Sequence, residues 1–183
     1  MPFAGDQMPK LVATLLSRNP VPALAHFLGG ALVLALGAFQ FNGGLRRRYP
    51  AMHRWSGRLY VAGILAGGIG ALAMVPRAMG GLPAQAGFGI LGLIWLGTTG
   101  AGFLHIRRGN LMAHRTWMLR SYALTFAAVT LRIYLPLMVS AGVPFETAYA
   151  AVAWLCWLPN LLVAEWIIRR SVPAEPIIRP SVS

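Results

Sequence analysis

Long apolar runs separated by short polar segments divide the chain into five parts. A helix that spans a bilayer needs about 20 mostly apolar residues, because each residue rises about 1.5 Å. Segments of about ten alternating residues, which are typical of a membrane β-barrel, do not occur. The pattern therefore predicts an all-α fold, an integral membrane bundle of five transmembrane helices. The five runs are Val21–Phe41, Leu59–Val75, Gly87–Leu104, Trp117–Met138 and Tyr149–Ile168.

The composition agrees with this prediction, and the charges add an orientation. Hydrophobic residues make up 57% of the chain and charged residues 11%, whereas a soluble domain carries roughly 25% charged residues. With five spans, 12 of the 16 Lys and Arg residues fall on one face of the membrane. Basic loops stay in the cytoplasm. We therefore expect the N-terminus outside and the C-terminus in the cytoplasm, and nucleic acid is not an expected partner despite the net charge of +12.

The two ends of the chain differ from the five runs. Residues 1–20 lack the basic start and the cleavage site of a signal peptide, and "PKLVATLLSR" indicates an N-terminal segment that lies in the membrane interface. Residues 171–183 hold three prolines and no apolar periodicity, which is typical of a flexible tail. We expect an interfacial segment at 1–20, the helical bundle at 21–170 and a cytoplasmic tail at 171–183. Abundant arginine, alanine and glycine hint at a GC-rich bacterial genome. Together with the five spans and the arginine asymmetry, this leads us to expect a bacterial inner-membrane protein.

One basic, aromatic phrase occurs twice. "RRRYPAMHRWSGRLY" (46–60) and "RRGNLMAHRTWMLRSY" (107–122) both hold paired arginines, then His-Arg, then Trp, Arg and Tyr in the same order. In each case one apolar run ends before the phrase and the next begins within it. This predicts a duplicated helical hairpin, helices 1–2 and 3–4, with a fifth helix added. An interfacial belt of Arg, Trp and Tyr would produce the same residues without any duplication.

Three segments resemble a known family. They are "ALAHFLGGALVLALGAFQF", "HRWSGRLYV" and "HRTWMLRSYALTFAAVTLRIYLP", within Ala23 to Leu137. They look like the signatures of predicted prokaryotic membrane proteins that are catalogued as a domain of unknown function. The resemblance implies a multi-pass membrane protein and supplies no activity or ligand. The matching positions are His26, Gln40, His53, Arg58, His114, Arg120 and Arg132.

Three histidines suggest a redox site. His53 and His114 begin the second and fourth helices on the basic face, and His105 ends the third helix there. Small membrane cytochromes hold b-type haem between histidines of different helices. Any two of the three could supply axial ligands to haem b, with Arg58 and Arg120 as partners of its propionates. Other cofactors, and any metal, are left open by the sequence.

A second set of polar residues lies inside the runs. An arginine within a span is costly unless it faces the bundle interior or reaches outward, and we expect Arg132 to point inward toward His26 of helix 1. Glu165 can pair with Arg169 or with Arg120. Pro159 should kink the fifth helix. The expected ligand site or buried polar cluster consists of His26, Gln40, Ser121, Thr125 and Arg132.

These features favour a protein without catalytic residues. The chain has no phosphate-binding glycine loop, nucleophile elbow, HExxH or CxxC pattern. The first hypothesis is a non-catalytic accessory, assembly, or ligand- or lipid-binding membrane module. The second is a b-type haem protein, and the third is a small oligomeric transporter. The expected partners are the bilayer, anionic lipid headgroups on the cytoplasmic face, and a second copy or a larger membrane complex.

Overall fold

The computed structural model describes residues 4–171, and these residues form helices joined by short turns. Within this range there is no strand, and five helical stretches are long and apolar enough to cross a membrane. The prediction of an all-α membrane bundle with five spans is therefore confirmed. The stretches are Pro20–Gln40, Pro50–Arg77, Gly81–Arg107, Leu111–Ser140 and Phe145–Ser171.

Several spans consist of more than one helix. The helices, in chain order, are α1 (Ala4–Arg18), α2 (Pro20–Gln40), α3 (Gly43–Arg48), α4 (Pro50–Met74), the 3-10 turn η1 (Val75–Arg77), α5 (Gly81–Arg107), α6 (Leu111–Thr125), α7 (Ala127–Ser140), α8 (Phe145–Leu155) and α9 (Leu158–Ser171).

The fifth span breaks where the sequence predicts a kink. Pro159 is the second residue of α9, and it cannot donate to the carbonyl of Leu155. The helix stops at Leu155 and restarts at Leu158. Asn160 Nδ2 donates to the carbonyl of Cys156 at 2.9 Å, so a side chain satisfies an acceptor at the break. The predicted kink is confirmed.

The fourth span has a break that the sequence did not signal by a proline. It separates α6 from α7 at Phe126. Thr125 donates to the carbonyl of Ser121 at 3.0 Å, and Thr130 donates to that of Phe126 at 3.2 Å. Such hydroxyl bonds to the preceding turn often bend helices. Pro136, by contrast, lies inside α7 without interrupting it.

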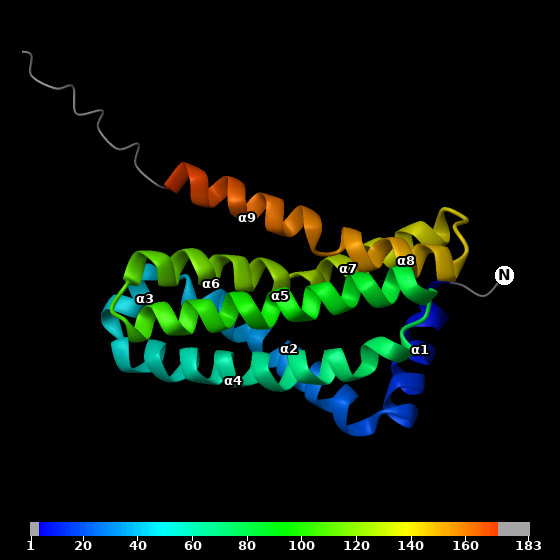
Figure 1. Ribbon diagram of the computed structural model, residues 1–183, viewed down its shortest axis with the longest axis horizontal. Helices are drawn as coiled ribbons and strands as arrows, with labels where there is room; N and C mark the ends of the chain where they lie inside the picture. The colour runs from blue at the N-terminus through cyan, green and yellow to red at the C-terminus, as the bar shows by residue number, and fades with distance from the viewer. Residues whose placement is uncertain (1–3, 172–183) are drawn as a thin grey trace, which may run out of the picture.

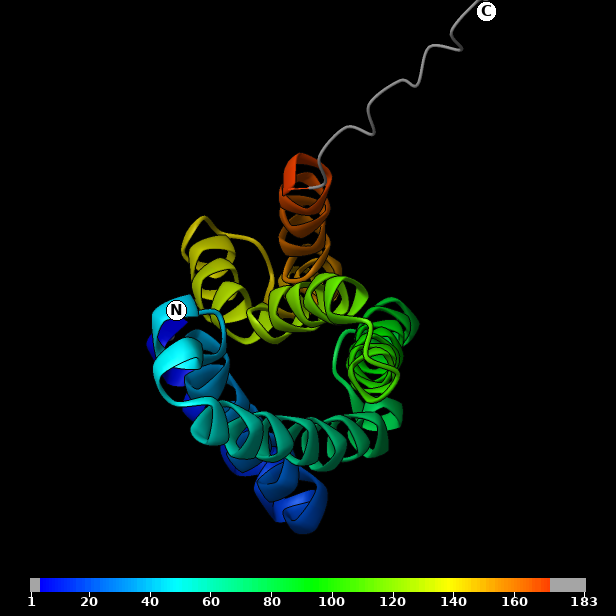
Figure 2. The same ribbon diagram turned by 90° about the vertical axis from the view of Figure 1, so that its left-hand side faces the viewer.

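Four helices run lengthwise, side by side: α2, α4, α5 and α6 (Figure 1). The chain folds as two hairpins, α2–α4 with α3 as its connection and α5–α6, and both hairpins begin at the same end. Figure 2 shows these helices as a ring seen from one end, with α9 pointing away from it. Helix α9 packs against α6 and α8, and its Asn160 donates a hydrogen bond to Thr130 of α7 at 3.0 Å. This parallel arrangement of the hairpins agrees with the predicted duplication.

The closest packing joins α2 to α4. A Cβ atom added to Gly29 would lie 2.6 Å from the carbonyl oxygen of Gly63, and one added to Gly70 would lie 2.5 Å from that of Pro22. Only glycine allows two helix backbones to approach so closely. Gly63 and Gly67, four residues apart on α4, both lie against Gly29 and therefore serve helix packing.

The expected end segments have separate outcomes. Residues 4–18 form α1, which packs against α2 and α7; its position in a membrane interface stays a prediction. The C-terminal tail expected at 171–183 lies outside the described residues, except for Ser171 at the end of α9. Arg179 lies in that part as well.

Candidate ligand-binding site

Most of the arginines belong to helices α3, α4, α5 and α6 near one end of the bundle, the end that carries α3 in Figure 1. Helices α4 and α6 begin there, and α2 and α5 end there. Many of the arginines lie next to an aromatic residue. The guanidinium carbon lies over the ring centroid of an aromatic residue in four pairs: Arg48–Tyr49 at 5.5 Å, Arg58–Trp55 at 4.6 Å, Arg120–Trp117 at 4.7 Å and Arg170–Trp166 at 4.0 Å.

A pocket of about 350 Å³ opens at this end, between α2, α3 and α4. Its volume falls in the range of small-molecule sites, about 300–1,000 Å³. Asn42 shapes one wall, because its side chain accepts a hydrogen bond from the N–H of Leu45 at 3.0 Å and so caps the short helix α3. The lining residues are Leu36, Phe39, Gln40, Leu45, Arg46, Met52, His53 and Ser56.

Two of the polar lining residues are bonded to each other. Gln40 Nε2 donates to Ser56 Oγ at 2.5 Å and lies 3.4 Å from the carbonyl oxygen of His53. Ser56 in turn donates to the carbonyl of Met52 at 2.7 Å. These bonds join the end of α2 to the first turns of α4. Within residues 4–171, the side chains of Arg46 and His53 take part in no hydrogen bond or ion pair, so both are available to a ligand.

The three candidate haem ligands do not share this pocket. His53 and His114 are each the fourth residue of their helices, α4 and α6. Only His53 lines the pocket. His114 Nδ1 lies 2.8 Å from the carbonyl oxygen of Gly102. Since a carbonyl cannot donate, Nδ1 carries a proton, and in a neutral imidazole Nε2 would then hold the lone pair. His105, near the end of α5, is half-buried.

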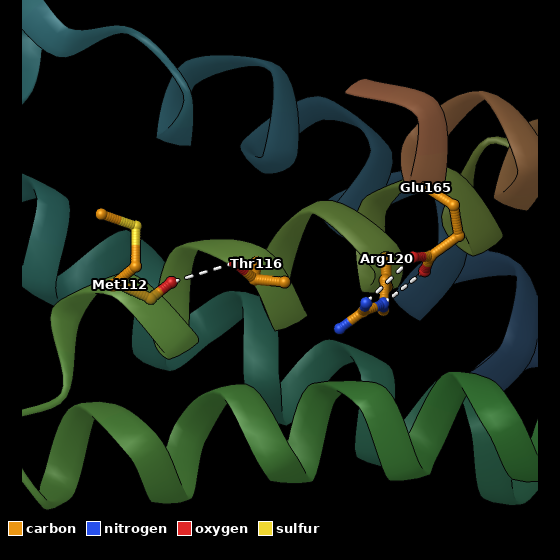
Figure 3. A network of polar contacts seen from close by, with 4 residues as sticks. All are labelled: Met112, Thr116, Arg120 and Glu165. Atoms are coloured by element: carbon orange, nitrogen blue, oxygen red, sulfur yellow. Dashed lines mark hydrogen bonds and ion pairs between the residues drawn. The ribbon is translucent and has the colours of Figure 1, made fainter. Parts of the chain in front are cut away.

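The candidate propionate partners differ in what they already bind. Arg58 stacks on Trp55. Arg120 forms a two-pronged ion pair with Glu165 of α9: Nε lies 2.5 Å from Oε1, and Nη2 lies 3.0 Å from Oε2 (Figure 3). Figure 3 also shows Thr116, one turn earlier, bonded to the carbonyl of Met112. Of the two partners proposed for Glu165, the structure selects Arg120. The arginine is therefore occupied by a protein carboxylate.

Two members of the expected polar cluster, Ser121 and Thr125, lie in a buried network that joins α4, α5 and α6. Thr125 Oγ1 accepts from Trp95 Nε1 at 2.9 Å and lies 3.2 Å from the hydroxyl of Tyr60. Ser121 Oγ lies 3.1 Å from the Tyr60 hydroxyl and 2.7 Å from Thr99 Oγ1. All five side chains are at most 6% exposed.

Every proton in this network has an acceptor. Thr99 donates to the carbonyl of Trp95 at 2.8 Å, and Thr125 to that of Ser121 at 3.0 Å. Ser121 can then donate to Thr99, and Tyr60 to Ser121 or Thr125. Among the described residues, no buried side-chain polar atom lacks a partner. The network is therefore complete without a ligand, and it holds helices together.

The other three members lie elsewhere, so the expectation of one cluster is wrong. His26 Nδ1 donates to the carbonyl of Gly67 at 3.0 Å, across α2 and α4. Gln40 lines the pocket. Arg132 is exposed and donates to the carbonyl of Ala128 at 2.7 Å, on its own helix. Arg132 does not point inward to His26, because its long side chain reaches outward while the backbone of its own helix supplies an acceptor.

Sequence reasoning missed some residues that line the pocket or complete the network. Helix periodicity identified Ser121 and Thr125, but Tyr60, Trp95 and Thr99 lie in other apolar runs, where they resemble ordinary membrane residues. Arg46 was noted only as part of a basic segment. Its place in the pocket depends on α3, a six-residue helix that no apolar pattern predicts. Within residues 4–171 no group of three or more His, Cys, Asp or Glu residues is arranged to hold a metal ion.

Comparison with known proteins gives a family. No curated protein and no solved structure matches the chain. A family described as a predicted membrane protein, DUF2306, matches residues 23–168, which include all five apolar runs apart from two residues of the first. The chain therefore belongs to this family of multi-pass membrane proteins.

Proposed function

We propose that this protein is a non-catalytic module of the bacterial inner membrane that binds lipids with anionic headgroups at its arginine-rich end. The observation that carries the proposal is the collection of arginines from four separate helices at that end, beside a pocket with apolar and basic walls. Arginine pairs well with phosphate and carboxylate groups. The aromatic partners fit the headgroup level of a bilayer.

The same asymmetry supports an orientation. Basic loops stay on the cytoplasmic side, so the arginine-rich end faces the cytoplasm in this proposal, with the N-terminus outside. An alkaline phosphatase fused after Arg77 should be active, and one fused after Arg108 should be silent. The opposite pattern would reverse the proposed orientation, and activity at both positions would contradict the assignment of the span between them.

Lipid binding is tested on the full chain in mild detergent. Native mass spectrometry should detect more phosphatidylglycerol than phosphatidylcholine retained when both are added in equal amounts. The preference should weaken as salt is raised, because exposed charges are screened over about 8 Å at physiological ionic strength. Equal retention of the two lipids at low salt would contradict the proposed function.

Haem b binding is the second candidate. What favours it is His114, whose Nδ1 donates to the Gly102 carbonyl and leaves Nε2 as a free ligand atom. Metal-bound histidines commonly make such a bond through their other nitrogen. Against it, only one of the three basic-face histidines lines the pocket. A Soret band that sharpens and shifts on reduction, and that His114→Ala abolishes, would establish haem; a colourless protein from haem-sufficient cells would refute it.

A further inference from the structure

We propose that the pocket between α2, α3 and α4 holds a single anionic amphiphile, with its hydrocarbon chain on the apolar wall and its phosphate or carboxylate on Arg46 and His53. This inference rests on the proposed function and deepens it. The general proposal needs only a basic surface. The present proposal specifies a pocket, two side chains that bind the anion, and an apolar wall that holds the hydrocarbon chain of the ligand.

The apolar wall requires a hydrocarbon cover. Phe39 is 62% exposed and Met52 is 47% exposed, and both line the pocket with Leu36 and Leu45. They lie at the arginine-rich end, where a bilayer presents headgroups and water. Apolar surface left in such a position is unfavourable by roughly 25 cal/mol for each Å². An acyl chain that enters the pocket would remove this surface from water.

The polar wall selects an anion. Gln40 and Ser56 bond to each other and to the backbone of α4, so their main donors are used. Arg46 and His53 are both half-buried, and within the described range their side chains have no hydrogen-bond partner. A guanidinium and an imidazole next to each other on an apolar pocket can both donate to one phosphate or carboxylate. No acidic residue lines the pocket to compete for them.

Neighbouring arginines show that this arrangement is specific to Arg46. Arg47 and Arg48 follow it on α3 and are exposed, and neither lines the pocket. Arg48 stacks on Tyr49. Arg47 therefore has the same charge, the same helix and almost the same depth, without access to the pocket. It serves as the matched control for a charge effect.

The test is native mass spectrometry of the full-length protein in mild detergent with phosphatidylglycerol as the probe. The wild type should retain one tightly bound lipid. Arg46→Gln and His53→Ala should each weaken its retention by about tenfold, the value of one charge-assisted hydrogen bond. Arg47→Gln should change retention less than about twofold, because exposed charges contribute little. Met52→Trp, which fills the pocket from an exposed position, should weaken retention while the charges remain.

Competition identifies the chemical source. Oleate should displace the lipid, because it offers both a chain and a carboxylate, and inorganic phosphate at the same concentration should not. Displacement by inorganic phosphate would show that the pocket binds a free anion instead of an amphiphile, and it would overturn the inference. Equal losses in Arg46→Gln and Arg47→Gln would also overturn it, leaving surface lipid binding intact. Failure of the wild type to prefer phosphatidylglycerol over phosphatidylcholine would remove the proposed function itself. Unchanged melting temperatures exclude unfolding as the cause.

Discussion

The two hairpins carry the same phrase and use it differently. In the first hairpin, α2–α4, His53 lines a pocket and Arg58 stacks on Trp55. In the second, α5–α6, His114 is bonded to Gly102 and Arg120 is bonded to Glu165. The Trp–Arg pair is nearly the same in both, with guanidinium-to-ring distances of 4.6 and 4.7 Å. In the first copy, the histidine faces a pocket and the arginine has no acidic partner. In the second copy, both side chains are bonded to other parts of the protein. We call the first copy open and the second closed.

The hairpins also pack by different means. The first brings backbones together through Gly29 and Gly63. In the second, the glycine Gly102 faces a side chain, because an added Cβ would meet Met118 Sδ at 2.7 Å. A helix pair joined by backbone contact cannot shift to accommodate an added atom, whereas a methionine can rotate. The difference suggests that the first hairpin is a rigid frame for the pocket and the second an anchor for α9.

Breaking the anchor of the second hairpin should have the largest effect. Arg120→Leu leaves the partly buried Glu165 without its partner between α6 and α9. We expect a loss of about 2 kcal/mol in the free energy of unfolding, less than for a fully buried pair because both side chains keep some contact with solvent. Arg58→Leu, the equivalent change in the first hairpin, should cost less than about 1 kcal/mol, because it removes one exposed cation–π contact. Unfolding in detergent, followed by circular dichroism, measures both. Equal losses would contradict the distinction between an open and a closed copy.

The glycine contacts should give the next largest effect. Gly29→Ala places a methyl group against the Gly63 backbone, and overpacking of this kind costs about 1–3 kcal/mol. Gly102→Ala should cost less than about 1 kcal/mol, since Met118 can move. Gly30→Ala is the control, because nothing lies within 4 Å of its added Cβ, and alanine favours a helix by up to about 1 kcal/mol. Tolerance of Gly29→Ala would show that α2 and α4 are not held in rigid contact.

The equivalent tyrosines offer a smaller contrast. Tyr60 is 1% exposed and bonds to Ser121 and Thr125, whereas the partly buried Tyr122 donates to the carbonyl of Leu34 at 3.2 Å. Tyr60→Phe should cost about 1–2 kcal/mol, because it leaves buried hydroxyl groups with one donor fewer. Tyr122→Phe should cost about 0.5 kcal/mol. Thermal melting of both variants gives the comparison, and a larger loss for Tyr122→Phe would contradict the assigned role of the network.

Substitution of Arg132, which lies outside both hairpins, should have the smallest effect on stability. Its guanidinium is exposed and bonds only to its own helix in the described structure. Arg132→Leu should therefore change the free energy of unfolding by less than about 0.5 kcal/mol, or stabilise the protein in lipid. The same unfolding assay applies. A loss above about 2 kcal/mol would restore the inward-facing arginine that the sequence suggested.

The sequence by itself determined the class of this protein. Five apolar runs would need either a bilayer or a soluble core, and this chain has too few polar residues to cover such a core. The membrane bundle then follows, because each run is long enough as a helix to cross the hydrocarbon layer. The sequence also determined the break at Pro159. Proline has no backbone N–H, so the helical hydrogen bond to the residue four positions earlier is lost whatever the tertiary structure is. The repeated phrase also located the basic end of the bundle. Arginine and aromatic residues mark the membrane interface, and the position of a residue relative to that interface can be read from the local sequence.

Only the tertiary structure decided which polar residues meet. Ser121 and Thr125 could be assigned to one helix face, but their partners Tyr60, Trp95 and Thr99 come from two other helices, and helix rotation is set by packing. Glu165 had two arginines within reach, and the packing of α9 against α6 brings it to Arg120. Arg132 could lie inside or outside at similar depth. The depth of a residue in the membrane follows from its position along its own helix. The rotation of each helix and the pairing of its side chains depend on contacts between helices such as Gly29–Gly63, which form only when the helices pack.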